Sequence, residues 1–406
     1  MPQPFSQRRR VHALSACALA CSAIAGVAHA QAPAPVRLGF LTDMSSQYSD
    51  GDGKGGVTAI QMAIEDFGGK LLGRPIELLS ADHQNKADIA STKSREWVDT
   101  QDVQLLIAGT NTATALAMGQ VANEKKRVLL INGAYSSNLT GSQCSPYWVH
   151  YNSDTTAIAR GTGRAVSEQG AKTWALLVAD YTFGHTLEAD VTQVVQAQGG
   201  QIVKSVRAPF HANDFSSYLV QVQASKAEIL GLANAGGDFM NSLKAAREFG
   251  VTPKMKPVAL MVFANEVESL GLKLAGGLMF TDSWYWDRSP EARAWTDRYY
   301  ARTKKMPTSL QASDYSSAMS YFKAVEKAQS LDADKVMQTL KSMPLNDMFG
   351  KGKIEPNGRY VHDMYLLQVK TPEESKGKHD AFKLIKALPG ETLFASKQEA
   401  QCPIWK

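Results

Sequence analysis

The sequence has few of the residues and motifs that catalysis requires. None of its four cysteines is placed as a nucleophile, and no Gly-x-Ser-x-Gly elbow occurs. The histidines at positions 83, 185, 211 and 362 are scattered, and none forms a helical i, i+4 pair of the metal-binding type. We therefore expect no metal and no other cofactor. The missing motifs also disfavour a secreted hydrolase, and we expect a protein that is not an enzyme.

One glycine-rich segment, residues 50–56, superficially resembles two ion-binding loops. As a calcium loop it fails, because Lys54 replaces an acidic ligand and Gln61 stands where a bidentate glutamate is required. As a phosphate loop it fails because no serine or threonine follows Lys54. We interpret the segment as a flexible loop that leads into a helix.

Long apolar runs are also missing after residue 30, so no membrane span is predicted there and the mature chain is expected to be soluble. Without the three arginines among the first ten residues, 41 basic residues face 39 acidic ones, a net charge of +2. No dense cluster of lysine and arginine occurs. The charge pattern therefore gives no reason to expect a nucleic-acid partner.

Residues 1–30 have the pattern of an export signal. Three arginines at positions 8–10 precede an apolar stretch over 11–27, and Ala28-His29-Ala30 offers small residues to a signal peptidase. We predict cleavage before Gln31. A lipid-anchored form at Cys17 and a twin-arginine export route remain open alternatives.

Removal of the signal leaves two cysteines, Cys144 and Cys402. In an oxidising compartment such a pair predicts a disulfide, and closing so long a loop would contribute ~4 to 5 kcal/mol in the chain-entropy model. Two unpaired thiols are the alternative, because a sequence does not supply the distance between them.

Short apolar runs alternate with amphipathic stretches from residue 36 onward, which predicts an α/β fold with parallel sheets flanked by helices. The predicted strands are 36–41, 76–81, 105–108, 128–131, 174–178, 202–207, 229–233, 258–262 and 278–280. The predicted helices are 56–67, 88–99, 113–123, 186–197, 215–224, 239–249, 290–303, 312–329 and 333–343.

The 376 residues after the signal are too many for one ordinary core, and the strand–helix series restarts once, so two lobes are predicted. We expect the chain to pass between them near 149–152, 280–283 and 350–356. The predicted N-terminal lobe is 31–150 plus 282–352, and the C-terminal lobe is 151–281 plus 353–406.

The loops after the predicted strands are rich in hydroxyl, amide and aromatic side chains. Ligands of open parallel sheets bind at these strand ends, where helix N-termini present free N–H groups. Taken alone, Thr112 and Ser136 are each more typical of ordinary helix caps, but their occurrence in neighbouring loops at one end of the sheet favours a site that holds a small carboxylate. The aromatic residues of these loops would enclose an apolar ligand or pack between the lobes.

The sequence resembles the leucine/isoleucine/valine-binding type of periplasmic substrate-binding protein that serves ABC importers. The resemblance covers nearly the whole chain after the signal, from residues 36–45 through 131–134 and 181–184 to Asp314-Tyr315. It implies the type I periplasmic fold, with a three-crossing hinge and a ligand trapped between the lobes. It also implies a periplasmic location, a monomer, and an inner-membrane permease with its ATPase as partners.

Carried over by position, the resemblance places the ligand at Thr112 and at the loop of residues 134–136. The full set of predicted ligand-binding residues is Tyr48, Asn111, Thr112, Ala134, Tyr135, Ser136, Tyr181, Phe183, Asn234, Phe263 and Tyr285.

One departure from the family bears on the ligand. Amino-acid binders have an acidic residue after the strand predicted at 258–262, where it meets the ligand's ammonium group, whereas this chain has Phe263-Ala264-Asn265, with Glu266 farther along. A buried ammonium without a partner would cost several kcal/mol. We therefore predict an aromatic or other apolar carboxylate as ligand, as in the branch of the family that binds benzoate-like acids. Binding of a branched-chain amino acid or amide, and ligand sensing for a separate receptor, are the alternatives.

Overall fold

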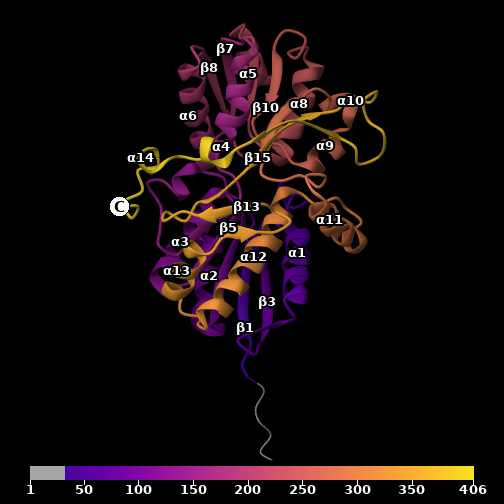
Figure 1. Ribbon diagram of the computed structural model, residues 1–406. Coiled ribbons are helices and arrows are strands. Elements are labelled where there is room, and N and C mark those ends of the chain that lie inside the picture. The colour runs from indigo at the N-terminus through magenta and orange to yellow at the C-terminus, as the bar shows by residue number, and fades with distance from the viewer. Residues whose placement is uncertain (1–32) are drawn as a thin grey trace, which may run out of the picture. The chain divides into compact units, whose positions relative to one another are not determined.

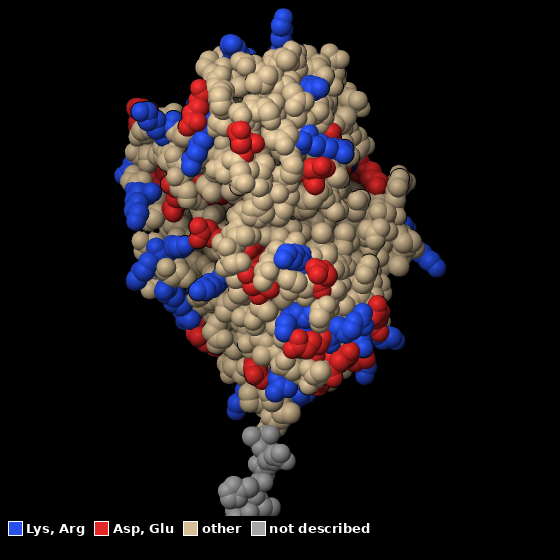
Figure 2. All heavy atoms as spheres, turned by 180° about the vertical axis from the view of Figure 1, so that it is seen from behind, with Lys and Arg blue, Asp and Glu red and all other residues tan. Residues whose placement is uncertain are grey.

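The computed structural model describes residues 33–406, and residues 34–406 form one compact unit. The predicted signal peptide and Cys17 lie outside the described residues. Within residues 33–406, no helix is both long enough and apolar enough to cross a membrane. Figure 2 shows basic and acidic side chains intermingled over the face drawn, in keeping with the near balance of charge.

The first sheet has the strand order β2-β3-β1-β4-β5-β6 and is parallel except for β2. Figure 1 labels β1, β3 and β5 of this sheet. Its strands are β1 Val36–Thr42, β2 Lys70–Leu71, β3 Arg74–Asp82, β4 Val103–Thr110, β5 Val128–Gly133 and β6 Trp148–His150. Between them run α1 Gly53–Asp66, α2 Ala87–Gln101, α3 Thr112–Lys125 and the 3₁₀ turn η1 Ser137–Leu139.

Successive residues of β4 face opposite sides of the first sheet, as the pleat of a strand requires. Leu105 and Ile107 pack in one cluster with α1 and with α12 (Ser309–Ala328), whereas Leu106 packs in another with α2 and α3. Both faces of the sheet are therefore covered, which explains why the strand is a continuous apolar run.

The second sheet is fully parallel, with the strand order β10-β9-β7-β8. Its strands are β7 Thr173–Ala179, β8 Gln201–Ala208, β9 Ile229–Ala233 and β10 Lys256–Ala259. The helices of this region are α4 Thr155–Ile158, the π-helical turn η2 Ala159–Gly163, α5 Arg164–Glu168, α6 Thr182–Ala197, α7 Ser216–Ala224, α8 Gly236–Glu248, α9 Ala264–Leu270 and α10 Leu272–Ala275.

The predicted α/β class is confirmed, and every strand and helix named from the sequence has a counterpart. One interpretation is wrong in detail: residues 53–56 are the first turn of α1, not part of a loop. Glycine is needed at Gly56 because an added Cβ would lie 2.6 Å from Asp314 Oδ2 and 2.8 Å from Phe40.

The sequence patterns miss the strands after residue 343. These strands belong to two small antiparallel sheets with the orders β11-β15-β16 and β12-β13-β14, of which only β11 was predicted. Their strands are β11 Met279–Asp282, β12 Leu345–Asn346, β13 Lys351–Ile354, β14 Tyr360–His362, β15 Met364–Val369 and β16 Phe382–Leu388. The remaining helices are α11 Pro290–Thr303, α13 Ala333–Ser342, the 3₁₀ turn η3 Gly390–Thr392 and α14 Lys397–Ala400.

Apolar packing assigns the late elements to different sheets. Residues of α11, α12, α13 and β14 join the core of the first sheet, and residues of β11 and β15 join that of the second. The chain therefore returns to each sheet after leaving it, as a multiply crossed hinge requires. The predicted limits of the lobes stay a prediction.

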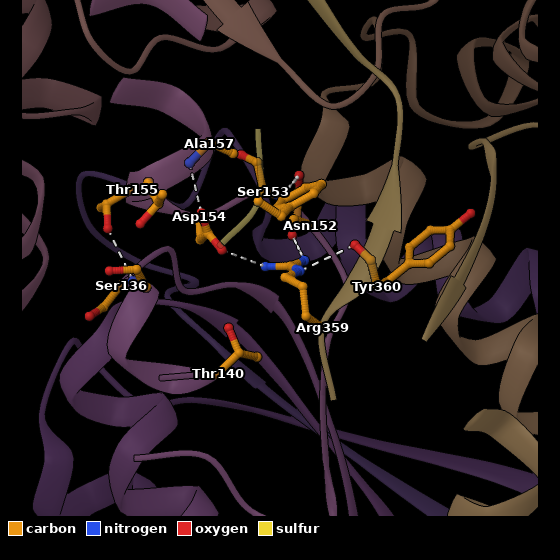
Figure 3. A network of polar contacts seen from close by, with 12 residues as sticks. Ser136, Thr140, Asn152, Ser153, Asp154, Thr155, Ala157, Arg359 and Tyr360 are labelled. Carbon is orange, nitrogen blue, oxygen red and sulfur yellow. Dashed lines mark hydrogen bonds and ion pairs between the residues drawn. The ribbon is translucent and has the colours of Figure 1, made fainter. Parts of the chain in front are cut away.

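A buried arginine, Arg359, connects two segments that run between the sheets, residues 152–154 and residues 359–360 (Figure 3). Arg359 donates from Nε to the carbonyl of Tyr360 (3.2 Å), from Nη2 to the carbonyl of Asn152, and from Nη1 to Asp154 (3.4 Å). Its guanidinium also lies 4.6 Å from the ring centre of Phe394 in the C-terminal tail.

The predicted disulfide is confirmed. Cys144 and Cys402 are bonded, with their Cα atoms 5.7 Å apart across 258 positions of sequence. The bond attaches the C-terminal tail to the loop that follows η1.

Candidate functional site

A narrow cavity lies where the carboxyl ends of strands from both sheets meet. It measures about 20 Å³, which is room for about one water molecule. No charged residue lines it. Its lining residues are Tyr48, Thr110, Asn111, Thr112, Gly133, Tyr135, Tyr181, Phe183, Ala235, Met261 and Phe263.

Seven of the eleven predicted ligand-binding residues line this cavity. They are Tyr48, Asn111, Thr112, Tyr135, Tyr181, Phe183 and Phe263. The other four do not line it: Ala134, Ser136, Asn234 and Tyr285.

The N-terminus of α3 forms the polar end of the cavity. Asn111, in a left-handed conformation with φ of 78°, caps the helix by accepting N–H groups from Ala113 (2.9 Å) and Thr114 (3.4 Å). Thr112 is 1% exposed, and its hydroxyl has no hydrogen-bond partner among the described residues. The hydroxyl of Tyr135, also in the lining, is likewise buried without a partner among these residues. Because a buried hydroxyl without a partner costs free energy, both groups favour a ligand or a water, and Thr112 is the one at the helix N-terminus.

The loop after β5 uses its polar groups differently. Ser136 accepts the N–H of Asn138 (3.3 Å) as the cap of η1, and its hydroxyl lies 2.9 Å from the hydroxyl of Thr186 in α6. Ala134 packs in the core between the first sheet and α3. Ser136 therefore acts as a helix cap, which was the alternative to ligand binding.

Five of the eleven lining residues are aromatic. The hydroxyls of Tyr48 and Tyr181 lie 2.9 Å apart, which joins the loop after β1 to the loop after β7. Burial raises the pKa of both tyrosines, so both remain neutral donors. Tyr135 and Phe263 form a tilted ring pair with ring centres 6.1 Å apart.

The two remaining predicted residues make structural contacts away from the cavity. Asn234 donates its side-chain amide to Ser242 (3.0 Å) and to the carbonyl of Asp238 (3.3 Å). Tyr285 packs edge-on against Tyr365, with ring centres 5.2 Å apart. It belongs to the core of the second sheet, whereas its neighbour Trp284 belongs to that of the first, as alternation along an extended segment requires.

Glu266 is buried beside the cavity but outside its lining. One carboxylate oxygen accepts the N–H of Gly236 (2.6 Å) and the other accepts the N–H of Phe263 (3.0 Å). Burial raises the pKa of Glu266 to about 8 despite these bonds. Both oxygens are thus committed to the backbone at the starts of α8 and α9.

The sequence prediction missed four lining residues: Thr110, Gly133, Ala235 and Met261. Each lies within two positions of a predicted site residue. Their position at the end of a strand could have identified them as lining residues, whereas the chemistry of their side chains could not.

Residues 35–378 match the family model described as periplasmic binding protein. The chain belongs to that family. It is similar to a periplasmic binding protein of Burkholderia mallei, with 55% identity, a TM-score of 0.91, and coverage of 92% of this chain and 100% of that one. This periplasmic binding protein also resembles a branched chain amino acid ABC transporter periplasmic ligand-binding protein of Burkholderia xenovorans LB400, with 39% identity, a TM-score of 0.82, and coverage of 91% and 100%.

The fold extends to more distant structures. A solute binding protein of an ABC transporter from Rhodopseudomonas palustris BisB5, in complex with 3,4-dihydroxy benzoic acid, is 21% identical with a TM-score of 0.80 and coverage of 88% and 98%. At this identity the likeness concerns the fold alone.

Proposed function

We propose that this protein is the periplasmic solute-binding component of an ABC importer and that it captures a small carboxylate with an aromatic or other apolar body. The observation that carries the proposal is the uncharged cavity, which has five aromatic residues in its lining and the unpartnered hydroxyl of Thr112 at the N-terminus of α3. The protein would act as a monomer and deliver the ligand to a permease, whose ATPase drives transport.

The carboxylate belongs at the N-terminus of α3. There the Thr112 hydroxyl would donate to it, and the partial positive charge of the helix end would stabilise its negative charge. The rings of Tyr48, Tyr135 and Phe183 would then contact the apolar body of the ligand.

An α-amino acid fits this arrangement less well. Its ammonium group would need a carboxylate, and the nearby Glu266 lies outside the cavity lining with its two oxygens directed at backbone N–H groups at 2.6 and 3.0 Å. A buried ammonium left without a partner would cost several kcal/mol.

Ligand binding would require the two sheets to separate and close again. A cavity of about 20 Å³ has no room for a benzoate-sized molecule. Contacts that join the two sheets would break on opening. The contact between Ser136 and Thr186, outside the cavity lining, would form again on closure, whereas Tyr48 and Tyr181 would move apart to admit the ligand. A ligand that binds the closed form better shifts the population towards it.

A branched-chain amino acid is the second candidate, because the relative that is 39% identical carries that description. Calorimetric titration with leucine, 4-hydroxybenzoate and coumarate distinguishes the two. We expect heat of binding from an aromatic acid and none from leucine. Tight leucine binding without an aromatic-acid response would contradict the proposal.

A further inference from the structure

Two buried carboxyl groups meet beneath the candidate site. Asp52, at the start of α1, is 1% exposed and Asp314, in α12, is fully buried. Neither forms an ion pair with another described residue. Their nearest ionisable neighbours are acids and phenols: Asp43 after β1, Tyr135 after β5 and Tyr299 of α11.

Each carboxyl group accepts a hydrogen bond with one of its oxygens. Asp52 Oδ2 accepts the hydroxyl of Thr42 (2.5 Å), and Asp314 Oδ1 accepts the side-chain amide of Asn132 (2.8 Å). The other two oxygens, Asp52 Oδ1 and Asp314 Oδ2, are buried without a donor among the described residues.

These two oxygens face each other. A Cβ placed on Gly56 would lie 2.5 Å from Asp52 Oδ1 and 2.6 Å from Asp314 Oδ2, so both oxygens border the same small space. Asp52 also stands at the N-cap of α1 but makes no cap hydrogen bond, although aspartate favours that role. Its side chain is turned towards Asp314 instead.

We infer that Asp52 and Asp314 share one proton between Oδ1 and Oδ2 and act as a positioning pair for the ligand site. Two ionised carboxylates in contact and shielded from water would repel each other, whereas one proton supplies the missing donor and satisfies both oxygens. Burial raises the pKa of both groups, and the charge of Asp52 raises that of Asp314 further.

The pair can position the site because it is bonded to three strand ends. Thr42 ends β1 and its hydroxyl accepts the N–H of Thr110 at the end of β4 (3.2 Å). Asn132 lies in β5, directly before the lining residue Gly133. Loss of the proton would therefore disturb the loops that carry Tyr48, Thr112 and Tyr135. This consequence for ligand binding rests on the proposed function.

The sign of the pH effect follows from the raised pKa. The folded state holds the proton at pH values where the aspartates of the unfolded chain are ionised, so stability declines as the pH rises from about 4 towards the folded-state pKa. Asp314→Asn removes the titrating group but retains a donor for Asp52 Oδ1 and an acceptor for Asn132.

The first experiment compares denaturation of wild type and Asp314→Asn from about pH 5 to about pH 7. We expect the unfolding constant of the wild type to rise about tenfold per pH unit relative to the variant. Asp52→Asn is the second variant, and Asp287→Asn, which removes an exposed carboxyl outside the pair, tests whether the effect is specific. Parallel pH profiles for wild type and both variants of the pair would overturn the inference.

The second experiment needs no variant and no ligand. Neutron diffraction from wild-type crystals grown in deuterated buffer near neutral pH should show a deuteron between Asp52 Oδ1 and Asp314 Oδ2, and density without one would overturn the shared proton. If the proton is present but 4-hydroxybenzoate and leucine both fail to bind, the ligand proposal has failed and the pair stands. A pH profile of ligand affinity that flattens in Asp314→Asn supports the positioning role, and an unchanged profile overturns that role.

Discussion

At the scale of single residues, two hydroxyls that look equivalent in sequence have different surroundings. Ser136 caps η1 and contacts Thr186, whereas Thr112 is buried without a partner. A hydroxyl that already has partners in the protein gains little from a ligand. One without a partner gains the full hydrogen bond, so Thr112 should dominate recognition of a carboxylate.

Replacement of Thr112 by valine keeps the shape of the side chain and removes its hydroxyl. We expect the affinity for an aromatic acid to fall by about 1.5 to 3 kcal/mol, the range for a hydrogen bond to a charged group. Ser136→Ala is the matched control and should change affinity much less. Calorimetry on both variants measures this, and equal losses would contradict the assignment.

Glu266 gives a pH-dependent prediction at the same scale. Its folded-state pKa of about 8 lies above the ordinary value, so its contribution to stability is present below about pH 4 and is lost as the pH rises through about 8. In Glu266→Gln, we expect the free energy of unfolding to vary less with pH by up to about 1.4 kcal/mol per unit. Denaturant titrations from about pH 5 to 8 test this, and unchanged slopes would refute it.

At the scale of elements, the segments that cross between the sheets are held by buried polar contacts as well as by apolar packing. Arg359 bonds to the segment of residues 152–154 that follows β6, and it also contacts the C-terminal tail through Phe394. The side chains of Arg359 and Asp154 are only 2% and 3% exposed. A buried pair of this kind becomes costly when one member is removed, because the other charge stays desolvated.

Arg359→Met should therefore lower the free energy of unfolding by about 3 to 5 kcal/mol. Arg293→Met, which breaks an ion pair exposed on the surface, is the control and should leave the unfolding midpoint unchanged. Chemical denaturation of both variants measures the difference. Similar midpoints for the two would contradict a stabilising role for the buried pair.

At the scale of the whole molecule, the structure has contacts that only a closed arrangement allows. The hydroxyls of Ser136 and Thr186 lie 2.9 Å apart, and the side-chain amide of Gln47 accepts the N–H of Asp238 at 3.3 Å. Each contact joins a loop of the first sheet to a helix of the second. Hinge closure would make and break them together.

Cysteines at positions 136 and 186 test this motion. In Ser136→Cys/Thr186→Cys we expect a disulfide to form faster when an aromatic acid is bound, because the ligand favours closure. Thr162→Cys/Thr281→Cys is the control, since these hydroxyls lie 3.0 Å apart within the predicted C-terminal lobe. Oxidation rates followed by mass spectrometry give the result, and equal ligand effects on both pairs would refute hinge closure.

The extent of successful sequence prediction follows the strength of the local pattern. Buried parallel strands such as β4 and β9 are continuous apolar runs, and their positions were predicted correctly. β16 was missed because most of its residues are exposed, so it lacks the apolar pattern of a buried strand. Its antiparallel pairing with β15 leaves no mark in the local sequence. The sequence predicted which loops form the site, but not which side chains of those loops point into the cavity.

The sequence by itself determined the α/β class and the loops that bear the site, because these depend on periodicity and on the order of segments along the chain, and its resemblance to known binding proteins indicated the family. Only the tertiary structure decided that Cys144 meets Cys402, that Glu266 is committed to backbone N–H groups, and that Asp52 faces Asp314. These contacts join residues that are distant in sequence, or they depend on side-chain directions that tertiary packing sets. Their free energies depend on burial and direction, which a linear pattern does not contain.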